Sequence, residues 1–67
     1  MKHYLFKEKL SGEEFIIGAG DYAGEAAMVA EGIAQDIGEE YNNGEWYLYF
    51  LGELTDEEAE ASGLDEY

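Results

Sequence analysis

The chain of 67 residues has no cysteine, no proline and no arginine, and its three lysines all lie within the first nine residues. Without cysteine, neither a disulfide nor a thiolate metal site can stabilise the chain, and an oxidising compartment loses its main support. No apolar run approaches the roughly 20 residues that span a bilayer, and the first ten residues have no apolar signal-peptide core. We therefore expect a cytosolic protein with one domain over residues 1–67 and no membrane partner.

Acidic residues are abundant: 17 aspartates and glutamates against three lysines give a formal net charge of −14. Small domains designed for solubility carry a net charge of only about 2 to 8 in magnitude. Apart from Glu8, all of these acids follow Leu10, and no lysine or arginine follows it. Because nucleic acids and anionic membranes attract cationic proteins, the charge argues against direct binding to either. The ten aromatic residues distinguish the chain from acid-rich disordered sequences, so we expect it to fold.

The densest apolar stretch is Trp46–Leu51, which holds four of the ten aromatic residues. It is too short for a helix and rich in strand-forming residues, so it predicts a strand over Glu45–Leu51 against which the core is built. Both faces of this strand need partial cover, which favours a central or second position in the sheet. Alternation places Trp46, Leu48 and Phe50 on one face, and Tyr47, Tyr49 and Leu51 on the other.

The first 17 residues predict a β-hairpin. Lys2–Leu10 and Glu13–Ile17 alternate as strands, and Ser11-Gly12 between them is a turn signal. The predicted core face carries Tyr4, Phe6, Leu10, Phe15 and Ile17, and the outer face carries His3, Leu5, Lys7, Lys9 and Ile16.

Two helices are predicted from their caps and their apolar periodicity. Asp21 is a suitable N-cap for a helix that runs to about Ile37, and Gly38 stands where a glycine would end it. Thr55 and Glu58 fit a capping box at the start of a second helix, which has two turns and ends at Ser62-Gly63. The apolar stripe of the first helix contains Tyr22, Ala26, Val29, Ala30, Ile33 and Ile37.

The element order β-β-α-β predicts a small α+β domain, in which a three-stranded antiparallel sheet packs on one helix and a short helix follows. The third strand is expected beside the first, which gives the strand order 2-1-3. An alternative places a short strand at Glu39–Tyr41 and makes Asn43-Gly44 a second hairpin turn. We prefer the first arrangement because Glu39–Tyr41 is short and polar.

No residue pattern indicates catalysis or a bound cofactor. Gly18–Ala23 matches a G-x-G-x-x-A fingerprint, but a dinucleotide-binding domain needs more strands, and Asp21 would oppose the pyrophosphate. No serine stands at a spacing that pairs it with His3, the only histidine, as a catalytic nucleophile, and we interpret His3 as a surface strand residue. We expect no enzyme, no cofactor and no dedicated metal site, since the C-terminal acids Asp56, Glu57, Glu58 and Glu60 lack EF-hand spacing.

The acidic surface has two interpretations. In one, it is a solvated surface, as in a protein adapted to high salt. In the other, the carboxylates substitute for nucleic-acid phosphates, of which a duplex presents about one per 1.7 Å, and engage the cationic groove of a nucleic-acid-binding protein. Two rows would then form: Asp21, Glu25, Glu31, Asp36, Glu39 and Glu40 along the first helix and its flanks, and Asp56, Glu57, Glu58, Glu60, Asp65 and Glu66 in a terminal cluster.

A cysteine-free, proline-free acidic chain of this size and element order resembles the small inhibitors carried by phages and mobile elements, of the anti-CRISPR and anti-restriction DNA-mimic type. The resemblance covers the whole chain and rests on size, charge and element order. It implies an inhibitor in the cytoplasm of a host bacterium that occupies the nucleic-acid-binding groove of a defence nuclease complex. Such a protein is a monomer or weak homodimer and binds no nucleic acid itself. The alternative is an acidic interaction module that dimerises or docks through the sheet face of Tyr47 and Tyr49.

Overall fold

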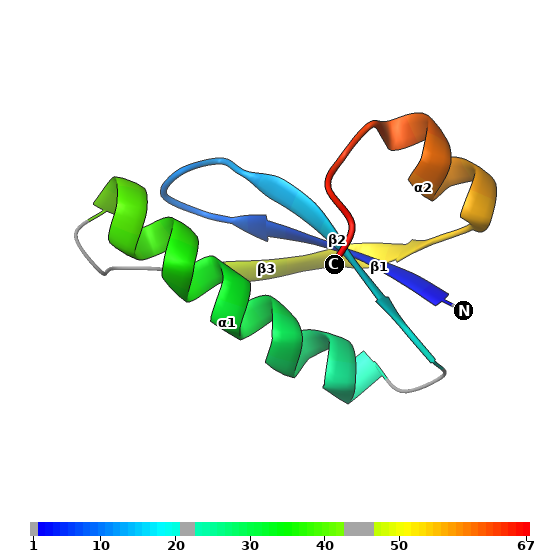
Figure 1. Ribbon diagram of the computed structural model, residues 1–67, viewed down its shortest axis with the longest axis horizontal. Coiled ribbons are helices and arrows are strands. Elements are labelled where there is room, and N and C mark those ends of the chain that lie inside the picture. Colours follow the sequence, from blue (N-terminus) through cyan, green and yellow to red (C-terminus); the bar gives the residue numbers. More distant parts are fainter. Residues whose placement is uncertain (1, 21–22, 43–46) are drawn as a thin grey trace.

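The fold is a three-stranded sheet with a long helix on one side and a short helix on the other (Figure 1). This computed structural model describes residues 2–20, 23–42 and 47–67. The strands are antiparallel in the order β2-β1-β3, so the α+β class and the predicted strand order are confirmed. The elements are β1 (Lys2–Glu8), β2 (Glu14–Ala19), α1 (Ala23–Asn42), β3 (Leu48–Leu54) and α2 (Asp56–Ser62).

The core lies between α1 and one face of β1 and β2. The strands supply large side chains, among which the rings of Phe6 and Phe15 stack with their centroids 6.2 Å apart. The helix supplies alanines one turn apart, and their short side chains let α1 lie close to these rings. The buried residues are Tyr4, Phe6, Phe15 and Ile17 of the sheet, and Ala26, Ala30 and Ala34 of α1.

β3 is an edge strand, as the predicted order 2-1-3 requires, so the separate expectation of a central or second position with partial cover on both faces is wrong. β1 is the central strand, because both other strands pair with it. The side chain of Leu48 packs against the core, whereas Phe50 is 57% exposed and Leu51 is also exposed. A run of aromatic residues predicts a strand without fixing its place in the sheet, since an edge strand can carry them too. Trp46 lies outside the described residues.

The pairing of β3 with β1 contains a bulge. The register shifts between Leu5 and Phe6, whose partners are Gly52 and Phe50, so Leu51 is an extra residue in β3. Gly52 has a φ of 137°, a backbone conformation that residues with a side chain rarely adopt. The glycine thus permits the bulge, which bends and twists the edge strand.

α1 continues past its predicted end to Asn42, so Gly38 does not cap it. Gly38 is buried inside the helix next to Ile37, which packs against the core, and a glycine there costs about 1 kcal/mol relative to alanine. The alternative strand at Glu39–Tyr41 is wrong, because these residues are helical. Asn43-Gly44, its predicted turn, lies outside the described residues.

Several side chains lie elsewhere than predicted. Val29 of α1 is exposed, whereas Ala34, which was not assigned to the stripe, is fully buried. The stripe is therefore centred on the alanines. Leu10 follows the end of β1 and is exposed instead of facing the core. Asp21 and Tyr22, the predicted N-cap and first stripe residue, lie outside the described residues.

The predicted start and end of α2 are confirmed. The Thr55 side chain accepts a hydrogen bond from the N–H of Glu58, and the Glu58 side chain accepts one from the N–H of Thr55, both at 3.1 Å. Gly63 ends the helix with a φ of 68°, the left-handed conformation that favours glycine. Both signals depend on neighbouring residues alone, so the sequence could specify them.

The residues after α2 pair with the outer edge of β2. The N–H of Ile16 donates to the carbonyl of Asp65 at 2.9 Å, and the N–H of Tyr67 donates to the carbonyl of Ile16 at 2.7 Å. The pairing is parallel, and the Tyr67 ring meets Phe15 edge-on. Ile16 is fully buried beside this segment, so its predicted place on an open outer face is wrong.

Candidate partner-binding surfaces

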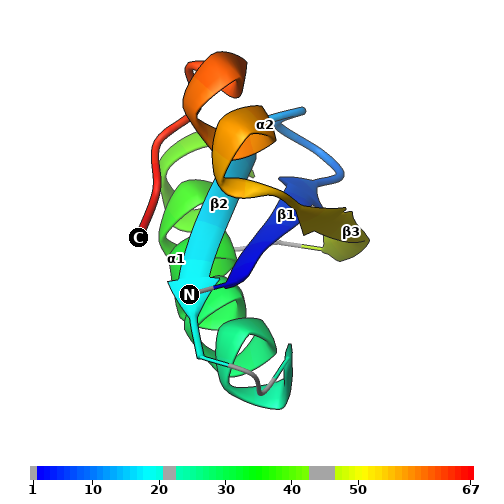
Figure 2. The same ribbon diagram turned by 90° about the vertical axis from the view of Figure 1, so that its right-hand side faces the viewer.

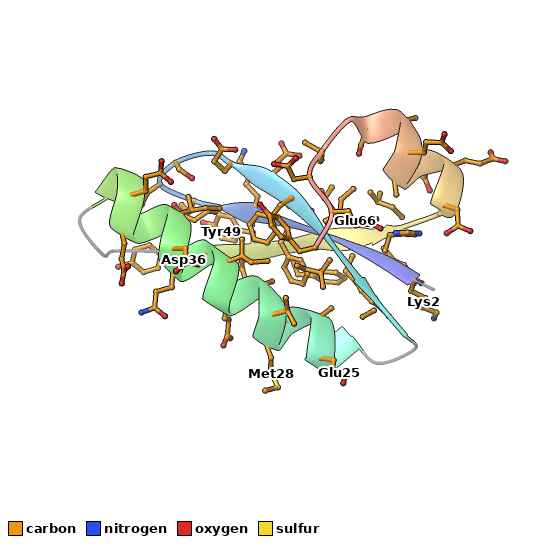
Figure 3. The ribbon with its side chains drawn as sticks, in the orientation of Figure 1. Lys2, Glu25, Met28, Asp36, Tyr49 and Glu66 are labelled. Atoms are coloured by element: carbon orange, nitrogen blue, oxygen red, sulfur yellow. The ribbon has the colours of Figure 1, made fainter. Side chains whose placement is uncertain are left out.

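The predicted carboxylates of the first helix lie on the exposed part of α1. Figure 3 shows Glu25 on the side of α1 that faces away from the sheet, together with Met28. At 3.6 residues per turn, Asp36 and Glu39 fall near the same line, so negative charge extends along a helix of about 30 Å. Among the described residues, no cation forms an ion pair with these carboxylates. The exposed acids of α1 are Glu25, Glu31, Asp36, Glu39 and Glu40.

The C-terminal acids lie on the opposite side of the sheet from α1. Tyr4 points into the core below α1, so its neighbour His3 points to the other face, where it contacts Asp56 of α2. The end-on view agrees, with α1 and α2 on either side of the strands (Figure 2). The two predicted rows are therefore not brought together, and one flat groove can meet only one of them. Asp21, assigned to the first row, lies outside the described residues.

Three of the C-terminal acids are engaged within the chain. His3 Nδ1 lies 2.5 Å from Glu66 Oε2, and His3 Nε2 lies 2.5 Å from Asp56 Oδ1. Glu58 completes the capping box described above. The hydrogen bonds to Asp56 and then to Glu66 raise the pKa of His3 above its usual 6.5. His3 lies on the outer face of β1 as predicted, but its neighbours leave its side chain only 12% exposed.

His3 therefore joins three segments: β1, the start of α2 and the segment that pairs with β2. Sequence reasoning missed this because the two carboxylates are 53 and 63 residues away. The remaining C-terminal acids make no side-chain hydrogen bond or ion pair within the described residues. They are the exposed Glu57, Glu60 and Asp65.

Glu8 is a fully buried carboxylate that sequence reasoning also missed. Its oxygens accept N–H bonds from Leu10 at 3.0 Å, Ser11 at 2.9 Å and Tyr47 at 3.1 Å. Burial alone would raise its pKa, but these bonds outweigh burial and hold the pKa below its usual 4.5. Glu8 thus joins the hairpin turn to the residue that precedes β3. The available signal was its alternation with Phe6, which places an acid on the core face.

Part of β3 is left uncovered, because α1 packs mainly on β1 and β2. Phe50 lies at the open margin of the core, with its ring centroid 5.4 Å from that of Phe6. A notch of about 280 Å³ opens there, and Gly24 and Ala27 of α1 line it together with the two phenylalanines. We call this the β3 notch.

The lysines lie in β1 or directly after it, and none forms an ion pair with an acid of α1 among the described residues. Lys2 Nζ lies 3.4 Å from a carboxylate oxygen of Glu53, and Lys9 Nζ lies 5.9 Å from the ring centroid of Tyr47. Lys7 is the register partner of Tyr49. Tyr47 is 57% and Tyr49 is 47% exposed, so the tyrosine face is accessible.

Neither a metal centre nor a membrane span is found in the described part of the chain. Within residues 2–20, 23–42 and 47–67, no three side chains of the types His, Cys, Asp and Glu are placed to hold a metal ion. No helix among these residues is both long and apolar enough to cross a membrane. In comparisons with known proteins, no family model matches the chain, and no curated protein or solved structure is similar to it.

Proposed function

We propose that this protein is a non-catalytic inhibitor whose carboxylates substitute for nucleic-acid phosphates in the binding groove of a host defence nuclease complex. The observation that supports the proposal is the line of exposed carboxylates along α1, with no cation paired to them among the described residues. A groove built for a duplex already presents cations to a line of negative charge. The host bacterial cytoplasm is the corresponding place of action.

The position of two of these acids near the end of α1 is better explained by partner binding than by helix stability. Glu39 and Glu40 lie in the last part of α1, where the helix dipole makes a carboxylate unfavourable by about 0.3–1 kcal/mol. No basic residue lies in the last turn to compensate. A surface selected only for solubility and folding would carry its acids nearer the start of the helix. The cost is offset if these acids meet cations of a partner.

The test is capture of a nuclease complex from a bacterial lysate, followed by competition with duplex DNA. We expect DNA to displace the captured complex and the protein itself to give no gel shift with DNA. Neutralising the α1 row should reduce the association rate about 10-fold or more at low salt, because long-range charge steers encounter. The row variant replaces Glu25, Glu31, Asp36, Glu39 and Glu40 with the corresponding amides.

A matched control removes the same number of charges elsewhere. It replaces exposed acids whose side chains make no hydrogen bond or ion pair within the described residues, and it should slow association much less. Simultaneous binding of the nuclease to the protein and to DNA, with unchanged affinity for each, would contradict the proposal. So would an equal loss in the control, which carries amides at Glu13, Glu14, Glu57, Glu60 and Asp65.

A second candidate is an interaction module that docks or dimerises through the tyrosine face. The exposure of Tyr47 and Tyr49 favours it. Lys7 and Lys9 lie beside these rings and offset part of the repulsion that a second acidic chain would meet there. Tyr49→Ala distinguishes the candidates, since it should dissociate such a dimer on a sizing column and leave a monomeric inhibitor unchanged.

A further inference from the structure

The β3 notch is an apolar opening on the surface of a chain with a net charge of −14. Phe6 and Phe50 form one wall, and Gly24 and Ala27 of α1 form the other. Phe50 is 57% exposed although its ring lies 6.3 Å from Tyr4 and 5.4 Å from Phe6 by centroids. The core is thus continuous with the surface at this point, because the helix stops short of covering the third strand.

The size of the notch limits what it can receive. At about 280 Å³ it is smaller than the pockets of roughly 300–1,000 Å³ that hold drug-sized ligands. It matches one or two apolar side chains from a macromolecule. Protein interfaces concentrate binding energy in such places, where an aromatic or aliphatic anchor fills a desolvated pocket.

The charges around the notch indicate the chemistry of the partner. Glu31 follows Ala27 by one helical turn and is exposed, whereas Glu53 on the neighbouring stretch of β3 is already paired with Lys2. With a net charge of −14 on the whole chain, a segment that approaches the notch is favoured if it is basic.

We propose that the β3 notch receives an apolar side chain from a lysine- or arginine-bearing segment of the protein partner. The inference rests on the proposed function, because it supplies the anchor for a partner whose cations meet the carboxylates of α1. The carboxylates attract any cationic surface, whereas the notch selects a segment with an apolar residue between its cations. The notch therefore adds specificity to an interaction that charge alone leaves unspecific.

A second copy of this chain fits the notch less well. Two copies would bring like charges of −14 together, and the exposed acids of α1 border the contact. The bulge at Leu51 and Gly52 also interrupts the regular backbone edge that two β3 strands would need for pairing.

The test uses two short lysine–glycine peptides, one with a central phenylalanine and the other with serine in its place. Titration followed by NMR should show the phenylalanine peptide binding about 10-fold more tightly, with shifts concentrated at the four notch residues. Ala27→Glu fills the notch while adding a negative charge, so it should remove the preference for phenylalanine without weakening the serine peptide. Phe50→Ser, which leaves the charge unchanged, should do the same.

Val29→Glu is the matched control, since Val29 is an exposed residue on another face of the same helix. It adds the same charge as Ala27→Glu, and the preference for phenylalanine should persist. Circular dichroism verifies that each variant is folded. If Ala27→Glu unfolds the chain, the result for Phe50→Ser decides the test.

Three outcomes would overturn the notch proposal: equal affinities of both peptides for the unmodified protein, loss of the preference in Val29→Glu, or a dimer that Ala27→Glu dissociates. Equal affinities together with an intact α1-dependent inhibition of the nuclease would leave the proposed function standing without the notch. Conversely, a confirmed preference without any nuclease partner would contradict the proposed function alone.

Discussion

Glu8 and His3 hold distant segments together and respond to pH in opposite directions. The pKa of Glu8 is depressed below 4.5 by its N–H donors despite burial, so its contribution is present above that value and is lost as pH falls. The pKa of His3 is raised above 6.5 by Asp56 and Glu66, so its contribution is complete below 6.5 and is lost as pH rises. These two residues favour greatest stability between about pH 4.5 and 6.5.

Replacing Glu8 with glutamine should destabilise the fold by about 1.5–3 kcal/mol at neutral pH, because hydrogen bonds to a charged acceptor are lost and an amide N–H₂ faces backbone donors. Urea unfolding followed by circular dichroism measures the change. Glu14→Gln is the control, since Glu14 is exposed on the next strand and should change stability by less than about 0.5 kcal/mol. Equal effects of the two substitutions would show that Glu8 has no special role.

For His3, the informative quantity is the pH dependence of the thermal midpoint. In the unmodified protein the midpoint should fall as pH rises from about 6 to about 8, because the imidazolium between two carboxylates loses its proton. His3→Gln should be less stable at pH 6 and should show a flatter profile over this range. If both proteins decline with the same slope, the titrating group lies elsewhere.

At the scale of the elements, the sequence predicted the strand order, the hairpin and the start of α2 correctly, but not the end of α1 or the cover of β3. The hairpin at Ser11-Gly12 and the capping box at Thr55 depend on adjacent residues, and both are present. Gly38 resembled a helix end, but α1 continues through it to Asn42. The two apolar faces of the aromatic strand suggested cover on both sides, but α1 packs mainly on β1 and β2 and leaves part of β3 open. How far one element covers another depends on contacts between distant residues, which local patterns do not specify.

The sequence predicted the acidic surface of α1 but not the internal bonds of the C-terminal acids. The sequence placed Glu25, Glu31 and Asp36 on the first helix, away from its apolar stripe. It assigned Glu39 and Glu40 to the flank of that helix, whereas the structure includes them in α1. It assigned Asp56, Glu58 and Glu66 to partner binding, whereas the structure shows each of them bonded within the chain. Nothing in the spacing of these residues revealed that His3 lies between two of them. The notch depends on how far α1 extends over the sheet, which no local pattern specifies.

The edge position of β3 has a direct consequence for stability. Ile17→Ala, in the fully packed layer below α1, should cost about 2–5 kcal/mol and can abolish folding in so small a domain. Leu51→Ala, at the exposed bulge, should cost less than about 1 kcal/mol. Chemical denaturation measures both. A larger loss for Leu51→Ala would mean that the aromatic strand, and not β1 with β2, carries the core.

At the scale of the whole molecule, the five exposed carboxylates of α1 form a face without paired cations among the described residues. Folding brings these like charges closer together, which opposes the compact state. If the proposed function holds, the same face orients the molecule as it approaches a cationic groove.

Added salt should therefore stabilise the fold by screening the repulsion among carboxylates. The thermal midpoint should rise between low salt and about 1 M sodium chloride, where the Debye length is about 3 Å. The amide variant of the α1 row should start from a higher midpoint and gain less from salt. A midpoint that falls with sodium chloride in the unmodified protein would mean that ion pairs dominate over repulsion.

The bulge at Gly52 affects the kind of aggregate that the protein forms when it precipitates. Near the isoelectric point of about pH 4.1, charge repulsion between molecules vanishes and the apolar side chains of β3 can meet. Fibril growth requires straight strands whose backbone groups pair from one molecule to the next. The twisted edge at Leu51 and Gly52 does not offer that template. Acidified samples are therefore expected to precipitate as amorphous, redissolving material without the cross-β signature.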